Sequence, residues 1–258
     1  MLLEALIATN TLSAAALVVA VRHLVLHRLR RRQRNLLSAW PIPRIAAGDI
    51  APGLKAGPLG PPPASEIVGI ANYRVPGGIS DLETWILCNL AKDARLIFEF
   101  GTATGKTTYL LARNAPPEAR VVTLTLDPRT ALEHASGPGD ARERRALVVE
   151  SLDTFVYLGT AAEPKITQLF GDSKTYDESP FAGRCDLVLV DGSHERSYVA
   201  SDSRKALRML RPGGYAFWHD YAGPRQVPGV YDALNELARD VPLRHIEGTM
   251  LVMYRKPA

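Results

Sequence analysis

The sequence predicts an α/β fold built on a doubly wound, mostly parallel sheet. Short apolar runs alternate with segments that carry helix signals, each run ends in polar residues, and one run leads directly into a glycine turn. Strands that alternate with helices are typical of βα units, in which helices connect parallel strands. Ligands of such sheets bind outside the carboxyl ends of the strands, so we expect the polar residues at these ends to meet in space.

The glycine turn follows the first apolar run, and together they read LIFEFGTATGKTT from Leu96 to Thr108. Gly101 and Gly105 bracket the turn, and glycine allows a ligand to approach the backbone closely. The helix that starts here offers free N–H groups to a polar or anionic ligand. A phosphate-binding loop needs four residues between its glycines, whereas this turn has three. The spacing therefore favours an adenosyl-cofactor turn.

Four later apolar runs also end in residues that can bind or react. They end in an acid, a GDS segment, a DGSH segment and an HD pair, and they span residues 121–127, 166–173, 186–194 and 214–220. Helices are expected around them. Ser80–Lys92 opens with a capping-box pattern of Ser80 and Glu83, and Glu195–Leu210 stops shortly before a proline and two glycines.

The first 35 residues predict an extra N-terminal helix. No charged residue occurs from Ala5 to Val21, and six arginines follow, which favours a membrane anchor. The positive-inside rule then places the protein at the inner, cytoplasmic membrane with its folded domain facing the cytoplasm. The alternatives are an amphipathic or oligomerising helix and a soluble cytoplasmic protein.

Residues 36–65 are expected to link this helix to a folded domain of residues 66–258. Pro41–Pro63 contains seven prolines and four glycines, which favours a spacer or, alternatively, a lid over the active site. Residues 1–35 carry a net charge of +5, which leaves −1 for the rest out of the total of +4. A near-neutral domain argues against nucleic acid and for a small-molecule or lipid-linked partner. A homo-oligomer is compatible with the sequence.

Four segments together resemble the class I S-adenosylmethionine-dependent methyltransferases. They read FEFGTATGKTTYLLA, KITQLFGDS, DLVLVDGSHERSYVASDSRKALRMLRPGG and YAFWHDY. The resemblance extends from about Ile79 to the C-terminus and is closest to the branch with DGSH after strand four and HD after strand five. It implies a Rossmann-like, seven-stranded sheet with a C-terminal antiparallel hairpin. Residues 242–247 and 249–254 fit the two strands of that hairpin.

The resemblance also implies where the cofactor S-adenosylmethionine binds. The implied cofactor residues are Glu99, Gly101, Thr102 and Gly105 at the methionine end, Asp127 at the ribose, Asp172 and Ser173 beside the adenine, and Asp191. Members of this branch carry the ribose acid two positions earlier, where this chain has Thr125. Residues two apart on a strand share a side, so Asp127 can replace it.

Methyl transfer to an oxygen requires an acceptor that is deprotonated or polarised, and two devices are open. Asp191 and Asp220 end neighbouring strands and can share a divalent metal, Mg²⁺, which lowers the pKa of a hydroxyl. The alternative is a general base, for which His194 and His219 qualify because imidazole titrates near neutral pH. We therefore expect Asp191, His194 and His219 to be catalytic.

The combined reading is an S-adenosylmethionine-dependent methyltransferase that acts on an oxygen of a small-molecule, sugar or lipid-linked acceptor. Two alternatives remain. The chain can be a nucleoside-triphosphate-binding enzyme, since Gly105, Lys106 and Thr107 complete the tail of a phosphate loop. It can also be a cofactor-binding scaffold without catalytic activity.

Overall fold

The computed structural model describes residue 17 and residues 19–26, 40–70, 78–135 and 152–258, without the side chains of 132–135. The chain divides into two units, Met1–Trp40 and Pro41–Ala258. Residues 19–26 of the first unit are helical. Within the described ranges, no helix is both long and apolar enough to cross a bilayer. Most of the expected anchor, residues 1–35, lies outside these ranges.

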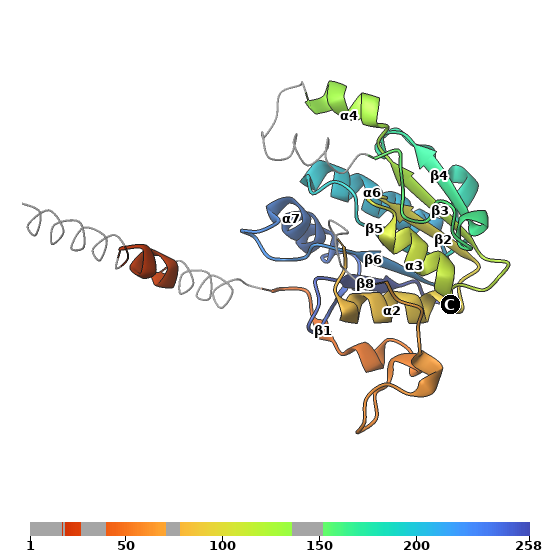
Figure 1. Ribbon diagram of the computed structural model, residues 1–258, viewed down its shortest axis with the longest axis horizontal. Helices are drawn as coiled ribbons and strands as arrows, with labels where there is room; N and C mark the ends of the chain where they lie inside the picture. Colours follow the sequence, from red (N-terminus) through yellow and green to blue (C-terminus); the bar gives the residue numbers. More distant parts are fainter. Residues whose placement is uncertain (1–16, 18, 27–39, 71–77, 136–151) are drawn as a thin grey trace, which may run out of the picture. The chain divides into compact units, whose positions relative to one another are not determined.

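The second unit is built on an eight-stranded sheet with the order β1-β7-β8-β6-β5-β2-β3-β4 (Figure 1). The strands from β6 to β4 are parallel, β8 runs antiparallel to β6 and β7, and β1 joins β7 in parallel. This confirms the predicted α/β class and the C-terminal hairpin. The strands are β1 (Arg44–Ile45), β2 (Leu96–Phe100), β3 (Arg120–Thr125), β4 (Ile166–Phe170), β5 (Cys185–Val190), β6 (Leu210–Trp218), β7 (Arg244–Ile246) and β8 (Val252–Arg255).

Helices cover both faces of the sheet. Neighbouring residues of a strand point to opposite faces, so apolar side chains of one strand pack against helices on both sides. Phe217 of β6 packs in one core cluster with residues of two helices on one face, whereas the indole of the next residue, Trp218, donates to Ser203 of a helix on the other. The first pair of helices is α2 and α3, and the second is α6 and α7. The helices are α2 (Asp81–Ala91), α3 (Lys106–Asn114), α4 (Pro128–Ala135), α6 (Arg196–Met209) and α7 (Pro228–Leu237).

Residues 41–65 differ from the expected spacer. They pack onto the domain through β1 and three short 3-10 helices, η1 (Ala47–Asp49), η2 (Pro52–Leu54) and η3 (Pro63–Ser65). Ile50 and Leu54 are buried in the same cluster as α2 and α3. Apolar residues between the prolines thus place this segment in the core, and β1 makes the sheet eight-stranded instead of seven-stranded.

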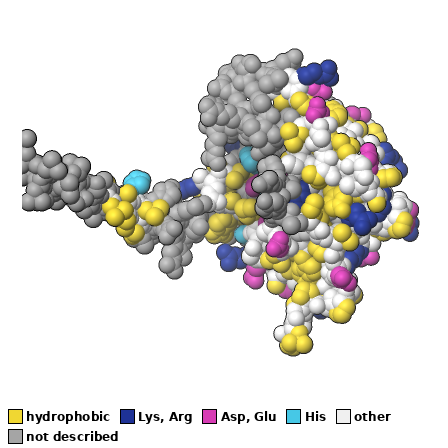
Figure 2. All heavy atoms as spheres, in the orientation of Figure 1, with side chains coloured by type: hydrophobic (Ala, Val, Ile, Leu, Met, Phe, Trp, Pro, Cys, Tyr) yellow, Lys and Arg dark blue, Asp and Glu magenta, His cyan; other side chains and the backbone are white. Residues whose placement is uncertain are grey.

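The register of the sheet brings three strand ends to one level. Phe100 of β2 pairs with Val190 of β5, which pairs with Trp218 of β6. The residues that follow these three therefore start side by side at the carboxyl edge. On the face seen in Figure 2, basic and acidic side chains of the described residues are interspersed over the domain surface.

Candidate active site at the carboxyl edge of the sheet

Gly101 follows β2 and lies directly against the end of β5. A Cβ at Gly101 would lie 2.1 Å from the carbonyl oxygen of Asp191, and the residue has a φ of +95°. Glycine is therefore required because the chain meets itself here. The sequence attributes Gly101 to close approach of a ligand, and the structure gives it this packing role in addition. A side chain at this position would disturb the fold as well as a binding site.

Gly105 caps α3 at its N-terminus with a φ of +76°, and an aromatic pair lies against it. A Cβ there would lie 2.8 Å from the ring of Tyr157. The rings of Phe155 and Tyr157 are stacked 5.2 Å apart, and the amide of Val156 donates to the carbonyl of Thr104 at 3.0 Å. The second turn glycine thus makes room for segment 155–157.

Glu99 lies below the turn in a network of neutral donors. The hydroxyls of Thr108 and Thr123 donate to its carboxyl oxygen, the latter at 2.7 Å. Burial raises the pKa of Glu99 to about 8, against the effect of these two hydrogen bonds. Glu99 is only 1% exposed. It therefore supports the turn from inside the domain and is protonated near neutral pH.

The same network reaches the aromatic pair. The hydroxyls of Thr102 and Thr123 lie 2.8 Å apart, and the amide of Gln168 donates to Thr102 at 3.2 Å. The hydroxyl of Tyr157 donates to the Gln168 carbonyl at 2.7 Å. A continuous chain of hydrogen bonds thus ties segment 155–157 to the glycine turn. This chain holds Thr102 in place.

Asp127, the expected ribose ligand, caps α4. Its carboxylate accepts the backbone N–H of Arg129 at 2.8 Å and two guanidinium bonds at 3.2 Å. The hydrogen bonds from Arg129 lower the pKa of Asp127, so the group is an anion. Its side chain is 26% exposed. Asp127 has a structural role that the sequence did not reveal, with part of the carboxylate still at the surface.

Asp172 and Ser173 follow β4 and lie against α6. Asp172 accepts the N–H of Lys174 at 2.9 Å, and the hydroxyl of Ser173 donates to Asp202 at 3.0 Å. Asp202 is 2% exposed, and burial raises its pKa to about 7. The GDS loop is therefore anchored to α6, on the opposite side of β3 from the glycine turn.

His219 lies among three carboxylates. Its Nδ1 lies 3.3 Å from Asp191 and 3.4 Å from Asp220, and its Nε2 lies 3.5 Å from Glu83 of α2. Burial disfavours the charged ring, but Asp191 and the other two acids outweigh it and raise the pKa of His219 far above its ordinary value. His219 is thus a cation near neutral pH. This differs from the expectation that it can serve as a base.

His194 pairs with Asp220 across the ends of β5 and β6. Its Nε2 lies 2.8 Å from the Asp220 carboxylate, and its side chain is 42% exposed. Burial raises the pKa of Asp220, but hydrogen bonds to His194 and His219 outweigh it and lower the pKa below the usual value. Asp220 has a φ of +62°, which is rare for a residue other than glycine and is often found at functional sites.

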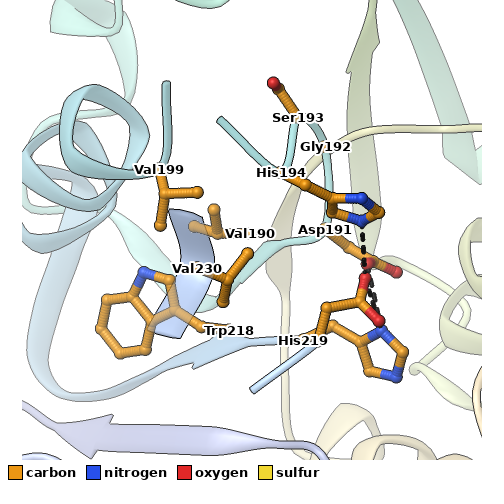
Figure 3. A pocket seen from close by; sticks show the side chains of 10 residues that line it. Val190, Asp191, Gly192, Ser193, His194, Val199, Trp218, His219 and Val230 are labelled. Atoms are coloured by element: carbon orange, nitrogen blue, oxygen red, sulfur yellow. Dashed lines mark hydrogen bonds and ion pairs between the residues drawn. The ribbon is translucent and has the colours of Figure 1, made fainter. Parts of the chain in front are cut away.

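Both histidines, Asp191 and Asp220 line a cleft at the carboxyl ends of β5 and β6, beside α6 and α7, and its space of about 220 Å³ includes open solvent. Figure 3 shows the ring of His194 and the ring of His219 on opposite sides of the carboxylates, with dashed lines marking their contacts. Apolar side chains form the rest of the wall, namely Val190, Val199, Trp218 and Val230. The cleft thus combines an apolar wall with an exposed His–Asp pair.

Sequence reasoning missed three residues of this site. Glu83 was identified as a helix cap, and the capping box is confirmed, but its contact with His219 spans 136 residues and leaves no local signal. Gln168 is a polar residue with a long side chain inside a mostly apolar run, which is a usable signal. Tyr157 carries none, because its packing on Gly105 depends on the fold.

Residues 98–221 match a family model described as a methyltransferase domain. They form a methyltransferase domain. They include the glycine turn, the GDS loop and the His194–Asp220 pair. No curated protein matches the chain.

The methyltransferase domain also resembles solved structures. A methyltransferase of Podospora anserina, PaMTH1, is 16% identical with a TM-score of 0.51, over 75% of this chain and 91% of that chain. The O-methyltransferase TomG of Streptomyces achromogenes is 22% identical with a TM-score of 0.46, over 69% of this chain and 82% of that chain. An O-methyltransferase of Bacillus cereus is 19% identical with a TM-score of 0.46, over 70% and 84%. The likeness to PaMTH1 supports the Rossmann-like fold.

Proposed function

We propose that the domain transfers a methyl group from S-adenosylmethionine to an oxygen of a small-molecule, sugar or lipid-linked acceptor. The observation that carries this proposal is the His194–Asp220 pair at the carboxyl edge of a methyltransferase domain. This pair is the part of the site that can accept a proton from a hydroxyl. Its residues come from the DGSH and HD segments, which supports the branch that the sequence indicates.

The cofactor is proposed to bind along the ends of β2, β3 and β4. The residues that would hold it are Glu99, Gly101, Thr102 and Gly105 at the turn, then Asp127, then Asp172 and Ser173, with Asp191 beside the turn. These ends follow one another in the sheet, which suits an extended ligand. S-adenosylmethionine supplies an electrophilic methyl group on its sulfonium sulfur. The PaMTH1 structure is described as bound to S-adenosylhomocysteine, a ligand that the proposal extends to this chain.

Isothermal titration tests the cofactor. The full chain should bind S-adenosylhomocysteine with a stoichiometry of one and should not bind ATP. Binding of ATP alone would establish the nucleoside-triphosphate alternative. Binding of S-adenosylhomocysteine without methyl transfer to any acceptor would instead favour the scaffold.

His194 is proposed as the general base, with Asp220 as its partner. Asp220 orients the ring and stabilises the imidazolium that forms when the acceptor hydroxyl gives up its proton. The deprotonated oxygen would then take the methyl group as its carbon–sulfur bond breaks, which would leave S-adenosylhomocysteine as the product and the proton on His194. His219 is unsuited to this role because it is already protonated, and it instead holds Asp191 and Asp220 in place. Asp191 contributes by keeping His219 charged.

A divalent cation is the rival way to activate the acceptor. Asp191 and Asp220 would be its carboxylate ligands, and their oxygens and a ring nitrogen of His219 lie within 4.8 Å of one another. Mg²⁺ prefers oxygen ligands. Protonated His219 lies against both carboxylates, so the donor set fits this imidazolium better than Mg²⁺. Turnover should therefore persist in excess EDTA, whereas loss on chelation and recovery with Mg²⁺ would establish the cation.

We also propose that residues 1–35 attach the protein to the cytoplasmic membrane. The support is the uncharged stretch from Ala5 to Val21 and the six arginines after it. A chain that starts at Pro41 keeps the whole second unit. On fractionation of cells, the full chain should sediment with membranes and the shorter chain should not. Recovery of both in the same fraction would contradict the attachment.

A further inference from the structure

Lys106 is a buried cation that none of the steps above uses. It is the first residue of α3, directly after Gly105, and it is 3% exposed. Among the described residues, no acceptor forms a hydrogen bond with its ammonium group and no carboxylate forms an ion pair with it. The side chain is covered over almost all of its surface, and an ammonium group whose hydration is restricted in this way without a neighbouring anion is unfavourable.

The other buried lysine of the described core shows the contrast. Lys205 is 6% exposed, and its ammonium group donates to the carbonyls of Lys174 and Tyr176 and lies 3.6 Å from Glu178. Carbonyl groups and a carboxylate of the domain itself therefore provide partners for the ammonium group of Lys205. Lys106 has no such set of partners, so its position suits an anion that the chain itself does not supply.

The surroundings of Lys106 favour a negative charge. Gly105 provides no side-chain cap for α3, and the first backbone bond of the helix runs from Tyr109 to Gly105. The earlier N–H groups therefore point out of the helix end, where the helix dipole is positive. Burial lowers the pKa of Lys106, and the charge of Asp81 at the start of α2 acts against this. α3 begins at Lys106 and α2 begins at Asp81, so the ammonium group lies near the N-terminal ends of two helices.

We propose that Lys106 binds the carboxylate of the methionine part of S-adenosylmethionine. This inference rests on the proposed function. The carboxylate is the one anionic group of that cofactor, and a lysine repels its ammonium and sulfonium groups. The order of strand ends agrees, because the turn after β2 and the GDS loop after β4 lie on opposite sides of β3. A carboxylate at α3 therefore leaves the adenine at Asp172 and Ser173.

The test compares ligands that differ at the carboxylate. Wild type, Lys106→Met and Lys106→Arg, all as full chains, are titrated with S-adenosylhomocysteine, its methyl ester, 5′-methylthioadenosine and ATP. Wild type should prefer S-adenosylhomocysteine over the ester by about tenfold or more, as for a hydrogen bond to a charged group. Lys106→Met should lose this preference and still bind 5′-methylthioadenosine within about twofold of wild type. Lys106→Arg should keep the preference.

Asp81→Asn is the matched control, because it removes a nearby surface charge and should leave the preference intact. If wild type binds S-adenosylhomocysteine and Lys106→Met keeps its preference over the ester, the role of Lys106 is refuted while the proposed function stands. An equal loss for all ligands in Lys106→Met would also refute it, since that indicates a structural effect. If wild type binds ATP and no adenosyl ligand, both the proposed function and the carboxylate site fail.

Discussion

Two glutamates near the carboxyl edge of the sheet are equally buried, but their pKa values are shifted in opposite directions. Glu83 and Glu99 are each 1% exposed. Burial raises the pKa of Glu99 to about 8, whereas hydrogen bonds from His219, Ser80 and Met250 overcome burial and lower the pKa of Glu83 to about 2. Burial alone therefore does not decide the charge of a carboxyl group, and the identity of its donors does.

The site has two halves, the turn after β2 and the ends of β5 and β6, and they differ in charge in the same way as the two glutamates. The turn after β2 rests on hydroxyl groups and a protonated Glu99, whereas the ends of β5 and β6 hold two histidines among acids. Burial raises the pKa of Asp191, whereas at Asp220 burial is outweighed by hydrogen bonds, which lower the pKa. Each half contains a residue other than glycine with a positive φ, Ala103 in the turn and Asp220 after β6. The hydroxyl network leaves Lys106 as a charged group beside the turn, which suits an anionic part of a ligand, and the ionic cluster suits proton transfer.

The largest expected effect tests the contact between the two halves. Gly101→Ala should lower the free energy of unfolding by about 3 kcal/mol or more, because its Cβ would strike the Asp191 carbonyl and its φ is positive. Gly192→Ala is the control, since the nearest atom to that Cβ is 3.5 Å away. Urea unfolding measures both. Equal effects of the two substitutions would contradict the close approach at Gly101.

The next effect compares the two glutamates directly. Glu83→Gln should cost about 3 kcal/mol at pH 7, because it leaves buried, protonated His219 short of an anion. Glu99→Gln should cost about 1 kcal/mol or less at pH 4, where glutamine resembles the protonated acid, and should stabilise the protein at pH 7, where only the unfolded wild type gains by ionising this glutamate. Urea unfolding of both variants gives the comparison. A larger loss for Glu99→Gln would mean that Glu99 is ionised.

The contributions of Glu99 and Glu83 to the free energy of unfolding should change with pH in opposite directions. Glu99 has a pKa of about 8 against an ordinary value of 4.5, so its stabilising effect is complete below pH 4.5 and is lost as the pH rises towards 8. The effect of Glu83 is complete above its ordinary pKa of 4.5 and is lost as the pH falls towards 2. Between pH 5 and 8, wild type should lose up to about 1.4 kcal/mol per pH unit relative to Glu99→Gln. A constant difference would rule out the raised pKa.

The smallest effect concerns the chain of hydrogen bonds above Glu99. Tyr157→Phe removes only the hydroxyl that donates to Gln168 and keeps the ring on Gly105. The loss of unfolding free energy should be about 1 kcal/mol. Thermal unfolding is sensitive enough to detect it. Tyr215→Phe serves as a control on β6, and no greater loss at Tyr157 than at Tyr215 would argue against the network.

Many of the strands and helices could be predicted, because the sequence patterns that indicate them lie within or next to each element. Apolar runs that end in DGSH and HD locate β5 and β6, and the Ser80 cap locates α2. The missed features depend on distant partners. The two residues of β1 lie between prolines and become a strand only through pairing with β7. Likewise, Gly105 reads as a ligand-binding glycine until Tyr157 is seen packed against it.

Methyl transfer itself tests the central claim, that the His194–Asp220 pair activates an acceptor hydroxyl. The full chain is incubated with methyl-labelled S-adenosylmethionine and a panel of sugar, phenol and lipid-linked acceptors, with and without EDTA. Wild type should label an oxygen of one acceptor class in both conditions, and His194→Ala and Asp220→Asn should each lower the rate by about a hundredfold or more. Undiminished transfer by His194→Ala, or transfer that EDTA abolishes and Mg²⁺ restores, would contradict the account.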